Sequence, residues 1–302
     1  MIVVFGSINI DLVTKVERIP APGETVIGGD YSKAPGGKGA NQALAARRAG
    51  GRVRMAGAYG RDGFADEALR LLRADGVDLA QALAVDSPTG AAFITVDGHG
   101  ENAIVVASGA NSAAKAEPLA SLDWRTGDWL IMQREVPDSE VFRAAEIARA
   151  GGAKVFLNNA PALPLTPSQV RLFDAICVNE TEAAILGAYL GFADRDPGAV
   201  AERLAKDFGV MAIATLGSLG AVLAHDGPTL RRAPPKVKVV DTTGAGDTFI
   251  GAFVAAMARG AGANTALREG LAAGSLACTL PGAQPSMPGA ADIARLAASL
   301  PD

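Results

Sequence analysis

The segment Asp241–Phe249 reads DTTGAGDTF and directly precedes a helical run, Ile250–Arg259. A glycine-rich turn before a helix presents unpaired backbone N–H groups at the positive end of the helix dipole, where a phosphate group is stabilised. Gly244 and Gly246 carry no side chain that would block such a group. Asp247 lies at the mouth of the helix, where a carboxylate can take the proton of an attacking hydroxyl as a general base. An aspartate at this position is also a common helix N-cap.

A second glycine-rich turn, Ala34–Gln42, reads APGGKGANQ and also opens a helix. It is not a Walker A motif, because the GxxxxGK[ST] spacing is absent, and it is not the GxGxxG dinucleotide fingerprint. One cation and one amide in such a turn suit a polyhydroxylated ligand, although a tight strand-to-helix connection would use the same glycines. Asn9 and Asp11 follow the first strand, and ligands of open α/β sheets collect at the carboxyl ends of strands. Both side chains can therefore bind sugar hydroxyls.

Two further segments combine polar residues with a turn or a helix start. Asn179–Glu182 reads NETE after an apolar strand, and its first and last residues share one face of a helical turn. They can meet one ligand or a hydrated Mg²⁺, or the acidic residues can simply complement the helix dipole. Thr215–Ala221 reads TLGSLGA between two strands, where it either carries the phosphates of a nucleotide or only turns the chain.

Short β-branched apolar runs alternate with longer helical patterns over most of the chain. Buried strands that alternate with amphipathic helices indicate a largely parallel sheet covered on both faces, so we predict a doubly wound α/β core. The predicted strands are Ile2–Phe5, Val53–Ala58, Trp129–Met132, Lys154–Leu157, Ala175–Val178, Met211–Thr215 and Ala221–Ala224. The predicted helices are Asn41–Ala49, Phe64–Ala74, Glu140–Ala150, Glu180–Leu186, Ala199–Phe208, Ile250–Arg259 and Ala263–Ala277.

Two segments break this rhythm by alternating polar and apolar residues without helical periodicity. The pair Thr89-Gly90 and the triplet Gly98–Gly100 are typical of the ends and turn of a hairpin. We expect residues 11–31 and 90–106 to form a small β lid. Residues 1–10, 32–89 and 107–302 are then the core, with the nucleotide and catalytic sites. Two ordinary surface loops would show the same pattern.

The bulk composition excludes several classes of function. The 302 residues carry a net charge of −4, which gives no electrostatic reason to expect nucleic acid or an anionic membrane as a partner. Cys177 and Cys278 each lie in an apolar run and are expected to be packing residues of a reducing compartment. The chain opens on a strand-like run without the pattern of a secretory signal, so we expect a cytoplasmic protein.

The order and spacing of the motifs closely resemble those of the ribokinase-like carbohydrate kinase family, from Val4 to Pro288. The motifs are GSINID at 6–11, PAPGET at 20–25, GGKGAN at 36–41, GRDGFA at 60–65, NETE at 179–182, TLGSLG at 215–220, DTTGAGDTF at 241–249 and GAQPSMP at 282–288. The resemblance implies a doubly wound core with a small β lid. It also implies an ATP-dependent sugar kinase that phosphorylates a primary hydroxyl, with D-ribose as the expected substrate and D-ribose 5-phosphate as the product.

The resemblance assigns roles residue by residue. Asp247 matches the catalytic base, and Gly244, Ala245 and Gly246 match the anion hole for the transferring phosphoryl group. The positions that match sugar-binding residues are Asn9, Asp11, Gly37, Lys38, Asn41 and Glu135. Nucleotide-binding positions fall on Asn179, Thr215, Gly217, Ser218 and Gly220, and the residue tied to Mg²⁺ is Glu182. The family's monovalent cation site, usually occupied by K⁺, falls on Asp241, Thr243, Ala277, Thr279, Gly282 and Ser286. Family resemblance further implies a homodimer that pairs through the lids, which would cover an exposed sheet edge.

Two positions depart from the family pattern. The family commonly has Asn-Pro-Ala-Pro where this chain has Asn-Asn-Ala-Pro at 158–161, and Arg134 replaces a hydrophobic residue beside Glu135. The sequence leaves open a kinase of the same fold for fructose, 2-keto-3-deoxygluconate, deoxyribose or a nucleoside. A sugar- or nucleotide-binding regulator is a second alternative, disfavoured because the candidate base and anion hole are both present. A nicotinamide oxidoreductase is disfavoured because no GxGxxG follows the first strand.

Overall fold

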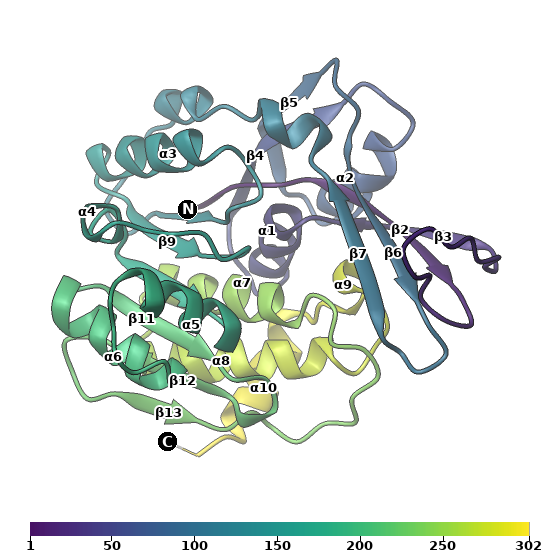
Figure 1. The fold of residues 1–302 in the computed structure, drawn as a ribbon. Helices are drawn as coiled ribbons and strands as arrows, with labels where there is room; N and C mark the ends of the chain where they lie inside the picture. The colour runs from purple at the N-terminus through teal and green to yellow at the C-terminus, as the bar shows by residue number, and fades with distance from the viewer. Residues whose placement is uncertain (302) are drawn as a thin grey trace.

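A nine-stranded sheet forms the centre of the protein in the computed structural model, which describes residues 1–301 (Figure 1). Neighbouring strands are parallel from β11 to β5, whereas β12 and β13 run antiparallel at one edge. In spatial order the strands are β13 (Leu230–Arg232), β12 (Ala221–Ala224), β11 (Met211–Thr215), β10 (Ala175–Val178), β9 (Lys154–Asn158), β8 (Trp129–Met132), β1 (Ile2–Phe5), β4 (Val53–Gly60) and β5 (Asp78–Val85).

Helices cover both faces of this sheet, which explains why its central strands are apolar throughout. In β1, Ile2 and Val4 belong to the core on one face and Val3 and Phe5 to the core on the other, because successive side chains of a strand point to opposite faces. The first face packs against α1 (Lys38–Arg48), α2 (Ala65–Ala74), α7 (Ala245–Ala258), α8 (Ala263–Ala277) and α10 (Ala290–Ala298). The second packs against α3 (Asp138–Ala150), α4 (Pro167–Val170), α5 (Glu180–Tyr189) and α6 (Pro197–Phe208).

A separate four-stranded sheet stands at one side of the core (Figure 1), in the order β3 (Tyr31–Gly36), β2 (Asn9–Lys15), β6 (Gly90–Val96) and β7 (Asn102–Ala107). The Gly98–Gly100 triplet lies in the hairpin turn between β6 and β7, as predicted. β3 lies beyond the boundary predicted at residue 31. Its Pro35 obscures the strand pattern, and proline is tolerated there because β3 is an edge strand.

The predicted α/β architecture is confirmed, and the differences concern particular elements. β5 was not predicted, because its Ala/Leu/Gln composition favours a helix, whereas pairing with β4 makes it a strand. α7 begins at Ala245 rather than at Ile250, so the predicted base lies inside the first helical turn. Among residues 1–301, no helix combines the length and apolar character required to cross a membrane.

Candidate active site

The predicted site residues gather at the edge of the sheet where the parallel strands end. The loops after β1, β8, β9, β10 and β11 open onto this edge, and α1 packs directly against α7 (Figure 1). The glycine-rich turns that start these two helices therefore meet, although they are far apart in the sequence. The fold thus brings together the two strongest motifs of the chain.

The start of α7 is shaped by Gly244, whose φ of 74° is the left-handed conformation that favours glycine. A Cβ on this residue would also lie 2.9 Å from the Cβ of Ala283. Gly244 is the N-cap residue, and no side chain caps the helix. The alternative that Asp247 is only an N-cap is therefore wrong.

The carboxylate of Asp247 is instead held by two amides from the first turn of α1. Asn41 Nδ2 donates to Asp247 Oδ2 at 2.9 Å, and Gln42 Nε2 donates to Asp247 Oδ1 at 2.8 Å. Asp247 is buried, with 8% of its surface exposed. Gly37 precedes this turn with a φ of 88°, and a Cβ there would lie 2.8 Å from the backbone nitrogen of Asn9. Two donors on a buried carboxylate hold it in one orientation.

A cavity of about 140 Å³ opens in front of Asp247. It is lined by Lys38, Asn158, Ala160, Cys177, Val178, Asn179, Glu182, Thr215, Gly244, Gly246, Asp247 and Ile250. The cavity thus joins the predicted anion hole and base to predicted sugar, nucleotide and magnesium residues. The predicted turn at Gly217–Gly220 begins just beyond Thr215, and Gly244, Gly246 and Asp247 at the start of α7 also line the cavity.

The predicted sugar-binding side chains form an acidic cluster beside this cavity. Glu135 Oε2 accepts hydrogen bonds from the Lys38 backbone N–H, at 3.1 Å, and from the Ser7 hydroxyl. Burial, together with the negative charges of Glu135 and Asp247, raises the pKa of Asp11 to about 6. Asp247 raises the pKa of Lys38, with smaller contributions from Glu135 and Glu182, so the ammonium group remains charged among these carboxylates.

Asn9 lies in the same cluster, at the start of β2. Its Oδ1 accepts a hydrogen bond of 2.6 Å from Asn111 Nδ2. Asn111 Oδ1 in turn accepts from the backbone N–H of Ile8, at 2.9 Å. Asn111 therefore fixes the turn that leads from β1 into the small sheet.

Asn179 and Glu182 form a capping box at the start of α5. Asn179 Oδ1 accepts from the Glu182 N–H and Glu182 Oε2 accepts from the Asn179 N–H, both at 2.8 Å. Burial raises the pKa of Glu182, and the charge of Asp247 adds to the effect. The NETE motif therefore starts α5 and also lines the cavity. The capping box fixes the side chains of Asn179 and Glu182 in the cavity wall.

Two of the predicted cation residues, Thr243 and Gly282, contact Asp241 directly. Its Oδ1 accepts from the N–H and hydroxyl of Thr243, at 2.9 and 2.7 Å, and its Oδ2 accepts from the Gly282 N–H at 2.8 Å. Burial opposes ionisation, but these hydrogen bonds outweigh it and lower the pKa of Asp241. The Asp241 N–H also donates to the Cys278 carbonyl, at 3.3 Å, which draws in the segment that holds Ala277 and Thr279. Ser286 donates to the Ala283 carbonyl, beside Gly244.

The sequence motifs contained four further polar residues of the site whose importance was not predicted. Ser7 belongs to GSINID, Gln42 directly follows Asn41, Gln133 precedes Arg134, and Asn158 ends β9. Asn158 could have been found from the rule that ligands lie at strand ends. The contacts of Ser7, Gln42 and Gln133 could not be found in this way, because they depend on how α1 lies in the folded protein against α7 and the end of β8.

Arg134, the predicted departure beside Glu135, does not line the cavity. Its guanidinium pairs with both carboxylate oxygens of Asp138, at 2.7 and 2.6 Å, and lies 5.4 Å from the centre of the Phe142 ring. The side chain is 1% exposed. Arg134 is thus a buried structural residue, which removes the reason for connecting it with the choice of sugar.

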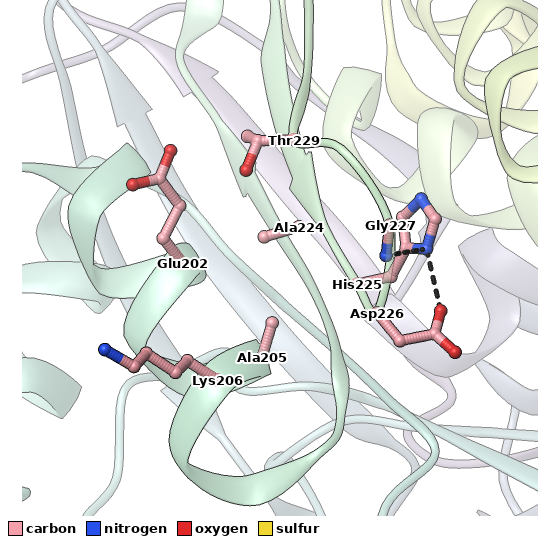
Figure 2. A pocket seen from close by; sticks show the side chains of 8 residues that line it. All are labelled: Glu202, Ala205, Lys206, Ala224, His225, Asp226, Gly227 and Thr229. Atoms are coloured by element: carbon pink, nitrogen blue, oxygen red, sulfur yellow. Dashed lines mark hydrogen bonds and ion pairs between the residues drawn. The ribbon is translucent and has the colours of Figure 1, made fainter.

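A second hollow, of about 370 Å³, lies between α6 and the end of β12 (Figure 2). It is larger, but Ala224 pairs with Ala212 at the start of β11, so the hollow lies at the opposite end of the sheet from Asp247. Figure 2 shows the charged ends of Lys206 and Asp226 pointing away from one another. His225 Nδ1 contacts Asp226 Oδ1 at 3.1 Å. No predicted site residue lines this hollow, and its charged groups do not converge.

Comparison with known proteins establishes the family of the chain. Residues 1–290 match the pfkB family of carbohydrate kinases. The chain belongs to this family. It is 39% identical to the ribokinase of Haemophilus influenzae over 94% of each chain, and 38% identical to that of Lactococcus lactis over 94% of this chain and 93% of that one.

Solved structures of pfkB family members share the fold over almost the whole chain. The crystal structure of ribokinase from Thermotoga maritima has a TM-score of 0.88 with 33% identity, over 98% of both chains. The Arabidopsis thaliana ribokinase complexed with ribose and ATP has a TM-score of 0.87 with 30% identity, again over 98% of both chains. The protein is therefore an ATP-dependent carbohydrate kinase, and the regulator and oxidoreductase alternatives are excluded.

Proposed function

We propose that this pfkB family kinase phosphorylates the primary hydroxyl of D-ribose with ATP and yields D-ribose 5-phosphate and ADP. The observation that carries the proposal is the buried carboxylate of Asp247, held by Asn41 and Gln42 at the N-terminus of α7 and facing a cavity with sugar-type ligands on one side. The ribokinases of Haemophilus influenzae and Lactococcus lactis, and the Arabidopsis thaliana ribokinase complexed with ribose and ATP, support ribose as the substrate.

The reaction requires one proton transfer and one phosphoryl transfer. Asp247 accepts the proton of the primary hydroxyl while that oxygen forms a bond to the γ-phosphorus of ATP. The bond between the γ-phosphorus and the β–γ bridging oxygen breaks, and ADP leaves with the electron pair. The N–H groups of Gly244 and Gly246, at the start of α7, stabilise the negative charge that develops on the transferring group. The Ala245 N–H donates to the Thr242 carbonyl, at 3.2 Å, and holds the shape of this turn.

The sugar is held between the two sheets of the protein. Asn9 and Asp11 lie on β2 of the small sheet, whereas Lys38, Asn41 and Glu135 belong to the core. Gly37 leaves the backbone accessible at the turn between them. Closure of the small sheet over the sugar would exclude water and limit hydrolysis of ATP.

The nucleotide lies along the other wall of the cavity. We assign it to Asn179 and Thr215, which line the cavity, and to the Gly217, Ser218 and Gly220 turn that follows. Glu182 presents a carboxylate to the same cavity, a hard oxygen ligand that fits Mg²⁺, directly or through water. Mg²⁺ bound there would neutralise the charge of the phosphates.

A monovalent cation fits the residues around Asp241. This carboxylate keeps its charge, and the other members, Thr243, Ala277, Thr279, Gly282 and Ser286, offer hydroxyl and carbonyl oxygens, the ligands that K⁺ prefers. A cation held there would fix the shape of the loop that leads to Gly244.

We further propose that the small sheets of two chains pair in a homodimer. β7 is an edge strand, and three consecutive apolar residues, Ile104, Val105 and Val106, are 50–68% exposed. Phe93 on the neighbouring β6 is 52% exposed. An exposed apolar edge of this kind is a site of pairing between chains. Analytical ultracentrifugation of the wild type and of Val105→Lys tests this proposal, because a monomeric wild type contradicts it.

The test of the proposed function is ADP release by the purified protein with Mg-ATP and a panel of sugars and nucleosides. We expect turnover with D-ribose well above that with fructose, 2-keto-3-deoxygluconate, deoxyribose or a nucleoside. Turnover with one of the other compounds alone would keep the kinase chemistry and overturn ribose as the substrate. Phosphorus NMR of the product would identify the phosphorylated hydroxyl.

A further inference from the structure

Three buried side chains form a continuous chain of hydrogen bonds that ends on the catalytic carboxylate. Gln133 Nε2 donates to Gln42 Oε1 at 2.6 Å, and Gln42 Nε2 donates to Asp247 Oδ1 at 2.8 Å. Both glutamines have no exposed surface. Gln133 directly follows β8, so the chain crosses from the end of a sheet strand through α1 to α7.

The orientation of each amide in this chain is fixed by its neighbour. Asp247 Oδ1 accepts the hydrogen bond from Gln42, so Gln42 turns its NH₂ group toward Asp247 and its oxygen toward Gln133. Gln133 must then direct its own NH₂ group to Gln42. The consequence is that Gln133 Oε1 faces the interior without a hydrogen-bond partner.

The fold tolerates this unpaired oxygen and also makes room for it. A buried oxygen without a donor destabilises a protein, and such groups are rare in native structures. A Cβ on Gly6 would lie 1.9 Å from Gln133 Oε1, so the glycine that opens the GSINID motif leaves the space that this amide occupies. An apolar residue at 133 would remove this unpaired oxygen but leave Gln42 Oε1 without its donor, and an apolar residue at 42 would leave Asp247 Oδ1 without its donor. The amides are therefore tied to the carboxylate of Asp247.

We propose that Gln42 and Gln133 are positioning residues for phosphoryl transfer: they hold Asp247 in the orientation in which it takes the proton from the sugar hydroxyl. Neither residue lines the cavity. Asn41 holds the other carboxylate oxygen, so the two amides of α1 fix both the position and the rotation of the base. The inference rests on the proposed function, since it assigns Asp247 the role of base.

The test compares variants that keep or remove the hydrogen bond and the volume separately. Gln133→Met keeps the length of the side chain but cannot donate, and Gln133→Asn keeps an amide that is too short to reach Gln42. We expect both to lower kcat by about tenfold, the scale of one hydrogen bond to a catalytic group. The KM values for sugar and ATP should change by less than about twofold, because uniform binding is untouched. A purely packing role predicts near-normal kcat for Gln133→Met and a loss only for Gln133→Asn.

A double-mutant cycle shows whether Gln133 acts through Gln42. If it does, Gln133→Met lowers kcat in the wild type but not in the Gln42→Met background. Gln81→Met is the matched control: Gln81 on β5 also has a buried Oε1 without a partner, but it lies at the far edge of the sheet, and its substitution should leave kcat unchanged. Circular dichroism and urea unfolding establish that each variant is folded.

The outcomes separate this inference from the proposed function. A wild type that turns over a sugar, with Gln133→Met equally active or with additive losses in the cycle, overturns the positioning role alone. A wild type inactive toward every sugar overturns the proposed function. In that case the same double-mutant cycle is measured by the free energy of unfolding. If the losses of stability from Gln42→Met and Gln133→Met were additive, the hydrogen bond between the two side chains would be contradicted.

Discussion

The guanidinium of Arg134 donates a hydrogen bond of 3.0 Å to Oδ1 of Asn159. Arg134 and Asn159 are the positions where we expect departures from the family pattern, and they lie against each other in the loops that follow β8 and β9. Asn159 also donates to the Leu163 carbonyl, at 3.1 Å, and the Arg134 N–H donates to the Ala160 carbonyl, at 3.0 Å. The two side chains therefore complement one another and fix the loop that leads to Ala160 in the cavity wall.

Arg134→Met should lower the free energy of unfolding by about 1–3 kcal/mol, because it leaves Asn159 Oδ1 and Asp138 without their donor. Asn159→Ala alone should cost less, and the double variant should cost less than the sum of the two. Urea unfolding at constant m-value measures these differences. Strictly additive losses would show that the two residues do not act as a pair.

Asp247→Asn should lower kcat by about 10²–10⁴, the contribution of a positioned general base, while ATP still binds. The amide keeps the shape of the carboxylate but cannot take the proton. Steady-state ADP release gives kcat, and calorimetric titration with ATP measures binding. Near-normal turnover would exclude Asp247 as the base.

The value of kcat/KM for ribose should fall as the pH is lowered through about 6, where Asp11 becomes protonated in the free enzyme. A protonated carboxyl accepts fewer hydrogen bonds from sugar hydroxyls. In Asp11→Asn the overall value should be lower and the inflection near pH 6 should disappear. If Asp11→Asn retained this inflection, another group would be responsible for it.

The same carboxyl predicts a pH-dependent effect on stability. Because the pKa of Asp11 is raised in the fold, the group favours folding below pH 4 and this contribution is lost as the pH rises through about 6. At pH 7.5 the free energy of unfolding of Asp11→Asn should therefore exceed that of the wild type by at most ~3 kcal/mol. The variant should then unfold at a higher urea concentration. At pH 4 the two proteins should be equally stable. A constant difference at all pH values would contradict the raised pKa.

Replacing K⁺ by tetramethylammonium should lower ADP release by the wild type and leave that of Asp241→Asn unchanged. The variant lacks the negative charge that would hold a cation beside the Gly244 turn. Asp226→Asn, in the hollow at the opposite end of the sheet, is the matched control and should respond like the wild type. Equal wild-type rates in both salts would exclude a functional cation site.

The alternation of apolar strands with helices predicted the core because burial on both faces leaves a strong pattern. β5 and the residues of β3 do not show this pattern, since their pairing depends on β4 and β2, which lie elsewhere in the chain. Sequence reasoning could not distinguish a base from a helix cap at Asp247, because the choice depends on where α1 crosses α7.

The candidate site was predicted mainly where residues lie in glycine-rich turns. Lys38 and Asn41 stood out in this way, whereas Gln42, one residue further on, did not, although it contacts Asp247 directly. Its importance depends on the direction of its side chain and on Gln133, which is 91 positions away. Conversely, the sequence connected Arg134 with the sugar only through its neighbour Glu135, and the structure shows that these adjacent side chains face different surroundings.

The hydrogen bond between Asn41 and Asp247 joins residues 206 positions apart in the chain. During synthesis, α1 emerges from the ribosome long before α7, and native contacts of such separation form slowly because the intervening chain loses much freedom when they close. Under the proposed assignment, the nascent chain therefore contains its sugar-binding side chains before it contains Asp247. Under the proposed mechanism a chain without α7 has no base, so we expect phosphoryl transfer only after α7 has folded onto α1.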